Sequence, residues 1–174
     1  YAELDENAKE ITSDGIIYLP YLMGERTPHL DPNCRGSFTG ISVNHNCFNF
    51  YRALLEGVCF SLKDCCEVIC ESGIDLNTIK VGGGGAKSRL WLQILADITT
   101  NNLYSSQCVE SGALGVAILA SVGSGFYNSV TEASEKMTVC DLTVTEFNAE
   151  KIDYYNSIYK TYKNLYCAIK SAQE

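Results

Sequence analysis

Four consecutive glycines, residues 82–85, lie in the stretch VGGGGAKSRLWLQ, between an apolar segment and a helix-like segment with the only tryptophan. A strand that ends in glycines before a helix leaves backbone N–H groups unpaired beside the positive end of the helix dipole. Such a corner attracts phosphate, because glycine adopts positive φ and lets a ligand approach the main chain. Ser88 suits the N-cap of the following helix. The stretch therefore predicts a site for a nucleotide or another phosphorylated ligand, with a tight turn that binds nothing as the alternative.

The glycine stretch matches neither common nucleotide-binding motif. Lys87 and Ser88 follow Ala86 rather than a final glycine, which excludes Gly-x-x-x-x-Gly-Lys-Ser/Thr. The residue three positions after Gly84 is Lys87, which excludes Gly-x-Gly-x-x-Gly. We expect a positive φ at Gly84 or Gly85, where a side chain would strain the turn.

Strand-like and helix-like segments alternate along the chain, which predicts an α/β architecture. Strands are expected over residues 15–22, 37–42, 78–83 and 103–107, with an extended segment over 142–147. Helices are expected over residues 46–71, 88–100, 111–121 and 149–171. A long loop, residues 23–36, follows the first strand, and loops of this length are usually functional.

Two of the expected helices carry apolar residues at the three-four spacing of a core-facing stripe. The stripe of helix 46–71 comprises Tyr51, Leu54, Leu55, Val58, Leu62, Cys66 and Ile69. The stripe of helix 149–171 comprises Tyr155, Ile158, Tyr159, Tyr162, Leu165, Tyr166 and Ile169. We interpret these tyrosines as core residues rather than cofactor contacts. Cys59, Cys66 and Cys70 share one face of the first helix and are expected to pack as small hydrophobic residues.

The composition excludes several classes of protein. The 174 residues suffice for one compact domain, and no apolar run reaches the roughly 18 residues of a membrane span. A net charge of −8 with only 13 basic residues argues against a nucleic-acid partner. Nine cysteines, an odd number without a secretory signal, favour the reducing cytoplasm. No Cys-x-x-Cys pair occurs, and His29 and His45 lack the spacing of ligands, so no metal site is predicted.

Four stretches together resemble the C-terminal domain of the FGGY carbohydrate kinases, most closely the xylulose kinases. They are GIIYLPYLMGERTPHLDPNCRGSFTGIS, NFYRALLEGVCFSLKDCCEV, IKVGGGGAKSRLWLQILADI and ESGALGVAILASVGSGFY. Residues 36–56 resemble the second signature of the family, except that Leu54 stands where a smaller or β-branched residue is usual. The loop LPYLMGERTPHLDP favours the xylulose kinases, and the gluconate, glycerol and ribulose kinases stay as alternatives.

The resemblance implies an actin-like ATPase domain of the ribonuclease H type, with a mixed sheet flanked by helices. Residues 1–174 would be the C-terminal nucleotide-binding lobe of a sugar kinase that uses ATP and Mg²⁺ to convert D-xylulose to D-xylulose 5-phosphate. The chain opens at Tyr1 without an initiator methionine, so we expect a piece of a longer protein. Because the N-terminal lobe would hold the catalytic base and most sugar contacts, no catalytic residue is assigned here. The chain alone is expected to be inactive.

The resemblance also implies which residues bind the nucleotide. The expected contacts are Gly83, Gly84, Gly85, Ala86, Lys87 and Arg89, with Arg89 nearer to the adenine. A helix with small residues, among them Gly112 and Gly115, would pack closely near the hinge between the lobes. The expected partners are the N-terminal lobe, the nucleotide, a ketopentose and, through an unpaired sheet edge, a second copy of the chain.

Two alternatives to the kinase lobe, from other classes, stay open. In the first the chain is a non-catalytic actin-like nucleotide-binding module, and in the second it is a scaffold whose glycine turn binds nothing. Within the long loop, Glu25 and Arg26 are expected to form a surface ion pair rather than to face a cleft. Glu56 is expected to fix its helix to the neighbouring loop.

Overall fold

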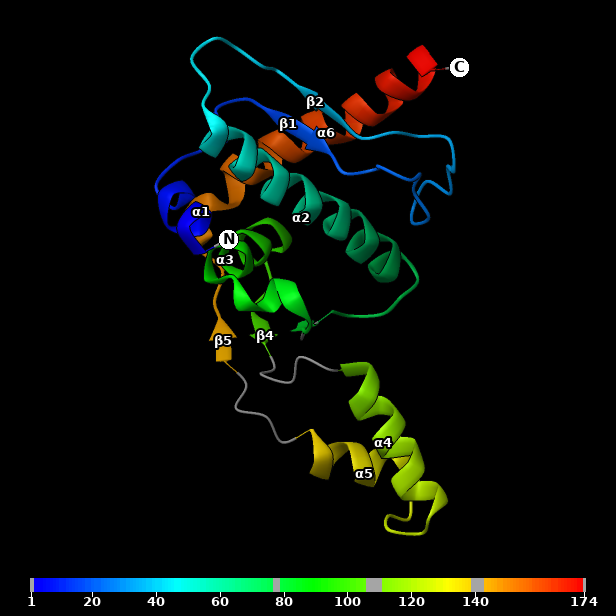
Figure 1. Cartoon of the computed structure of the whole chain (residues 1–174). Coiled ribbons are helices and arrows are strands. Elements are labelled where there is room, and N and C mark those ends of the chain that lie inside the picture. The colour runs from blue at the N-terminus through cyan, green and yellow to red at the C-terminus, as the bar shows by residue number, and fades with distance from the viewer. Residues whose placement is uncertain (1, 77–78, 106–110, 139–142, 174) are drawn as a thin grey trace.

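The computed structural model describes residues 2–76, 79–105, 111–138 and 143–173. Figure 1 shows the arrangement of the helices and strands. In chain order they are α1 (Ala2–Ala8), β1 (Ile17–Leu19), β2 (Ser37–Thr39), α2 (Cys47–Glu71), β3 (Ile79–Val81), η1 (Gly84–Lys87), α3 (Arg89–Thr99), β4 (Leu103–Ser105), α4 (Ser111–Gly123), α5 (Val130–Met137), β5 (Thr143–Thr145), η2 (Ala149–Lys151) and α6 (Ile152–Gln173).

Every expected strand and helix is present over part of its range. Residues 78, 106–107 and 142 of the expected strands lie outside the described residues. The sequence did not predict α1 or α5. Both are short and largely polar. α5 has three apolar residues at helical spacing, Val130, Ala133 and Met137, and its N-cap Ser129 accepts the N–H of Glu132.

The strands form two small sheets. β1 pairs with β2 antiparallel, and Tyr18 faces Phe38 across this ladder with the rings stacked at 4.4 Å. The second sheet has the order β3-β4-β5, with β3 parallel and β5 antiparallel to β4. This mixed sheet and the helices around it confirm the predicted α/β architecture.

The buried face of α2 differs from the predicted apolar stripe. Of that stripe Leu55 is buried, whereas Leu54, Leu62 and Ile69 are each 38% exposed. The buried residues are Asn49, Ala53, Leu55, Glu56, Gly57, Cys59, Phe60 and Asp64. β1 packs so closely that a Cβ on Gly57 would collide with the carbonyl oxygen of Tyr18. A small residue is therefore required on this face, and apolar periodicity does not detect it.

The tyrosines of α6 confirm the predicted core. Tyr155, Tyr159, Tyr162 and Tyr166 are all buried. Phe60 of α2 stacks on Tyr159 at a ring distance of 5.8 Å and lies 5.3 Å from the ring of Tyr162. The last helix is thus joined to α2 by aromatic contacts, which bury large apolar area in well-defined orientations.

α4 and α5 pack on each other and lie apart from α2, α3 and α6 in Figure 1. The small residues of α4 were expected to pack closely. Instead, an ideal Cβ on Gly112 or Gly115 would meet no atom within 4 Å, and Val116 and Leu119 are exposed. Within the described residues these two glycines have no close neighbour, and close packing near the hinge between the lobes stays a prediction.

Candidate nucleotide site and its surroundings

The glycine turn, residues 83–88, connects β3 to α3. Gly83 is the N-cap of the 3₁₀ helix η1 and has φ 82°, while Gly84 and Gly85 lie inside that helix. The predicted positive φ at Gly84 or Gly85 was therefore wrong in position. The reversal from strand to helix falls on the residue before η1, so that residue adopts the left-handed conformation that glycine tolerates.

α3 begins after η1 rather than directly at the glycines. The Oγ of Ser88 accepts the N–H of Trp91 at 3.0 Å, and the N–H of Ser88 donates to the carbonyl oxygen of Gly85 at 3.1 Å. Ser88 is thus the N-cap of α3, as predicted. Its side chain satisfies the N–H of Trp91, and the start of η1 offers further backbone amides that could face a ligand.

The two sides of the glycine turn differ in available space. An ideal Cβ on Gly83 or Gly84 would meet no atom within 4 Å, so this side of the main chain is open. On Gly85 the same atom would lie 2.8 Å from Cζ3 of the Trp91 ring. The turn therefore rests on the tryptophan through Gly85 and leaves Gly83 and Gly84 accessible.

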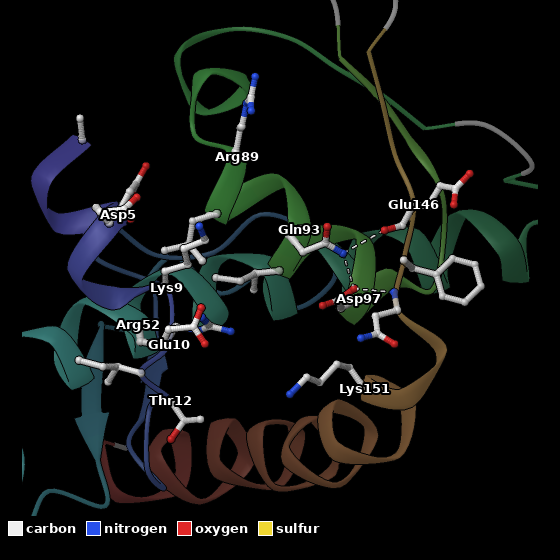
Figure 2. Close-up of a pocket in the computed structure, with 17 residues that line it drawn as sticks. Asp5, Lys9, Glu10, Thr12, Arg52, Arg89, Gln93, Asp97, Glu146 and Lys151 are labelled. Carbon is white, nitrogen blue, oxygen red and sulfur yellow. Dashed lines mark hydrogen bonds between the residues drawn. The ribbon is translucent and has the colours of Figure 1, made fainter.

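The glycine turn contains five of the six expected nucleotide contacts, and the sixth, Arg89, lies just beyond it. Gly83 to Lys87 are consecutive in the turn, whereas Arg89 lies in the first turn of α3 and lines a pocket of about 980 Å³. α1, α3 and the segment around η2 form much of this pocket. Figure 2 shows Arg89 pointing away from Gln93 and Asp97 at the pocket wall.

The buried carboxylate of Asp97 connects two of the segments that line this pocket. The Nε2 of Gln93 donates to Oδ1 of Asp97 at 2.8 Å and to the carbonyl oxygen of Glu146 at 2.9 Å. The N–H of Asn148 donates to the same Oδ1 at 2.8 Å. These bonds join α3 to the segment before η2. Sequence reasoning missed the pocket because it did not predict α1; the only signal for Asp97 was a carboxylate inside an apolar helix pattern.

Glu56 is buried in α2 beside α6. Its Oε1 accepts the Nε–H of Arg52 at 2.9 Å, and Nη2 of Arg52 donates to the hydroxyl of Tyr155 at 2.9 Å. The expectation that Glu56 fixes α2 to the neighbouring loop was wrong: its carboxylate bonds Arg52 within α2, and Arg52 leads on to Tyr155 of α6. Its Oε2 has no hydrogen-bond partner among the described residues.

The long loop is held against α2 and α6 by a set of polar and aromatic side chains, which we call the loop clamp: Tyr21, His29, Asp31, Asp64, Tyr162 and Tyr166. The hydroxyls of Tyr21 and Tyr162 lie 2.8 Å apart, and His29 stacks on Tyr166 with ring centroids 3.6 Å apart. The Tyr166 hydroxyl donates to Oδ2 of Asp31 at 3.0 Å. These contacts fix the middle of the loop to α6.

The carboxylate of Glu25 accepts hydrogen bonds from backbone amides of the long loop. It accepts the N–H of Thr27 at 2.5 Å and the N–H of His29 at 2.8 Å. The backbones of Glu25 and Asp31 also exchange two hydrogen bonds of 2.8 Å. No ion pair joins Glu25 and Arg26 in the described part of the loop, so the expected ion pair was wrong. The amides of the turn bond the carboxylate instead.

Two carboxylates of the loop clamp have opposite pKa shifts. Burial raises the pKa of Asp64, and this outweighs the opposing effects of the Tyr159 hydroxyl and of His29, whose Nε2 lies 3.9 Å from Oδ2 of Asp64. Burial also acts to raise the pKa of Asp31. There the N–H of Asn33 and the Tyr166 hydroxyl outweigh it, and the pKa is lowered.

Neither a metal cluster nor a membrane span is found in the described ranges. No group of three or more His, Cys, Asp or Glu side chains in them is placed to hold a metal ion. None of their helices is long and apolar enough to cross a membrane.

Comparison with known proteins identifies the family. The C-terminal domain of the FGGY family of carbohydrate kinases matches residues 1–124. The chain belongs to the FGGY carbohydrate kinases. A xylulose kinase from Bacillus subtilis is 38% identical over 160 residues, which are 92% of this chain and 32% of that protein. A glycerol kinase from Coxiella burnetii is 40% identical over 126 residues, 72% of this chain and 25% of that protein.

Solved structures of FGGY kinases share the fold. The xylulose kinase from Rhodospirillum rubrum superimposes with a TM-score of 0.83 at 27% identity, covering 99% of this chain and 34% of that one. The gluconate kinase from Lactobacillus acidophilus reaches 0.78 at 29% identity, over 97% of this chain and 34% of that one. The predicted actin-like ATPase fold is confirmed. This chain spans about a quarter to a third of the length of these FGGY kinases.

Proposed function

We propose that residues 1–174 form the C-terminal nucleotide-binding lobe of a xylulose kinase. The complete protein transfers the γ-phosphate of ATP to D-xylulose and yields D-xylulose 5-phosphate. The observation that carries this proposal is the similarity to a xylulose kinase over 92% of the chain, against 72% for the glycerol kinase. The catalytic base and most sugar contacts belong to an N-terminal lobe of the same polypeptide.

The glycine turn is the proposed nucleotide site. Its open side at Gly83 and Gly84 lets a phosphate reach the backbone amides at the start of η1. Lys87 and Arg89 are exposed nearby and add positive charge to a chain of net charge −8. Mg²⁺ bound with the triphosphate would supply charge neutralisation during phosphoryl transfer. This lobe orients the donor, and closure against the other lobe excludes water.

An assay of the full-length protein tests the proposed reaction. We expect ADP production that depends on D-xylulose and falls when the sugar is replaced by gluconate, glycerol or ribulose. The 174-residue chain alone should show no sugar-dependent turnover, because it lacks the base and the sugar site. Robust activity of the chain by itself would contradict the proposal. A full-length protein that binds ATP but phosphorylates no ketose or polyol would instead support a non-catalytic nucleotide-binding module.

A glycine substitution tests the site separately from the reaction. Gly84→Val in the full-length enzyme should raise the KM for ATP or lower kcat while the KM for sugar stays unchanged, because its side chain fills the open side of the turn. Gly123→Val is the matched control, since a Cβ there also meets no atom within 4 Å. The free chain should bind ADP only in the high-micromolar to millimolar range. It provides only one wall of the site, and the contacts of one wall offset only part of the entropy that the nucleotide loses on binding.

Two further properties are part of the proposal. We place the enzyme in the cytoplasm, which is supported by the seven free cysteine thiols in the described part of the chain. A homodimer stays a prediction. It would use an outer edge of the β3-β4-β5 sheet, and sedimentation of the purified chain would test it.

A further inference from the structure

The last two turns of α2 carry three cysteines, at positions 65, 66 and 70, that the proposed function does not use. The sequence suggested that Cys59, Cys66 and Cys70 all pack as small hydrophobic residues. In the structure Cys59 is buried, Cys66 is half-buried and Cys70 is exposed. All three are free thiols. The thiol face of α2 therefore runs from the core into solvent.

The spacing of Cys66 and Cys70 decides what can join them. They lie four residues apart on the continuous helix α2, which places their Cβ atoms about 5–6 Å apart. A disulfide needs about 3.5–4.5 Å between the Cβ atoms, so it would require the helix to bend. A single atom bonded to both sulfurs makes a longer bridge than a direct S–S bond. Such a bridge can span Cys66 and Cys70 without bending the helix.

Among the described residues, the number of candidate ligands near Cys66 and Cys70 is too small for a structural zinc ion. Structural zinc takes four ligands, and no group of three candidate ligands occurs in the described part of the chain. A trivalent arsenic that already carries one organic group needs only two sulfur ligands. We propose that Cys66 and Cys70 form a dithiol site for monosubstituted trivalent arsenicals.

The reaction needs no oxidant. An organoarsenic oxide, R–As=O, forms two As–S bonds with the two thiols; the two S–H protons leave with the oxygen as water, and arsenic stays trivalent. The exposed Cys70 reacts first. Burial raises the pKa of the Cys66 thiol, which makes it a slow nucleophile toward reagents in solution. Its attack on arsenic already bound at Cys70 is intramolecular and gains from proximity.

Cys65 provides the matched control. Its Sγ donates to the carbonyl oxygen of Thr27 at 3.3 Å, so it faces the long loop. It lies five residues from Cys70, which puts the two on different sides of the helix. Serine at Cys65 should therefore leave the dithiol site intact.

The test uses the full-length protein and phenylarsine oxide, followed by intact mass spectrometry after a wash with excess 2-mercaptoethanol or 1,2-ethanedithiol. We expect one adduct that survives the monothiol and is removed by the dithiol. Trypsin cleavage after Lys63 and Lys80 should place it in residues 64–80. The monothiol-resistant adduct should disappear in Cys66→Ser and in Cys70→Ser and persist in Cys65→Ser.

Three outcomes would overturn the site: no monothiol-resistant adduct, an unchanged adduct in either of the first two variants, or loss of the adduct in Cys65→Ser. Thermal unfolding of each variant verifies that the helix is intact, since serine is close in size to cysteine. If one variant fails to fold, the other and the mapped peptide still decide the result.

Discussion

The glycine turn and the long loop both contain residues that the sequence marks as functional, but they are held in opposite ways. The turn depends on the Ser88 cap and on the contact of Gly85 with Trp91, and its outer side is open. The loop is fixed by side chains of its own and by the tyrosines of α6. A backbone ligand site needs few side chains, whereas a long loop without strands needs many contacts to offset its conformational entropy.

The largest effect is expected from removing a central tyrosine of the loop clamp. Tyr162→Ala should lower the free energy of unfolding by about 3–5 kcal/mol, because a fully buried ring and the partner of the Tyr21 hydroxyl are both lost. Urea denaturation measures this loss. Tyr154→Ala, at a ring that is 38% exposed, is the control and should cost less than half as much. Equal losses would contradict the larger contribution expected from the buried Tyr162 and its bond to Tyr21.

A pair of glycine substitutions sharpens the contrast between the two sides of the glycine turn. Gly85→Ala should cost about 1–3 kcal/mol and change the fluorescence of Trp91, because the new methyl would lie 2.8 Å from the ring. Gly84→Ala should change stability by less than about 0.5 kcal/mol and leave the emission unchanged. A spectral change in Gly84→Ala would mean that the open side is occupied by the chain itself.

The pH dependence of stability should separate the two carboxylates of the loop clamp. The folded pKa of Asp31 is lowered, so its stabilising contribution is present above the unfolded value of about 3.9 and is lost as the pH falls through the folded pKa. Asp31→Asn should therefore flatten the acid side of the stability profile. The folded pKa of Asp64 is raised, so its ionised form opposes folding at neutral pH.

Asp64→Asn is the complementary variant. It should raise stability at neutral pH relative to the wild type and lose this advantage as the pH falls through the raised pKa of Asp64. Denaturation midpoints measured from acid to neutral pH test both variants. The same profile for both would contradict the opposite shifts.

The smallest effect is expected at the edge of the loop clamp. The Nζ of Lys170 lies 3.6 Å from Oδ2 of Asp31, and its side chain is 44% exposed. Lys170→Ala should lower the free energy of unfolding by less than about 1 kcal/mol, and the difference should vanish at high salt. A larger, salt-independent loss would indicate that the aliphatic part of Lys170 packs against the loop.

The sequence by itself determined the features that depend on neighbouring residues. Ser88 caps α3 as expected, because a cap bonds an amide three positions away. The tyrosines of α6 recur at three-four spacing, and a helix brings such residues to one buried side. The family also followed from the sequence, since its motifs occur in order between residues 15 and 127 and its C-terminal domain matches residues 1–124.

Only the tertiary structure decided which surfaces meet. The buried side of α2 was set by β1, whose approach at Tyr18 requires Gly57, and no periodicity of α2 alone encodes that approach. Glu25 accepts hydrogen bonds from backbone amides of its own turn. The adjacent opposite charges of Glu25 and Arg26 gave no sign of this, because the bonds depend on how the turn folds. Gly83 rather than Gly84 or Gly85 takes the positive φ, because η1 begins at Gly84 and the chain reverses at the residue before it.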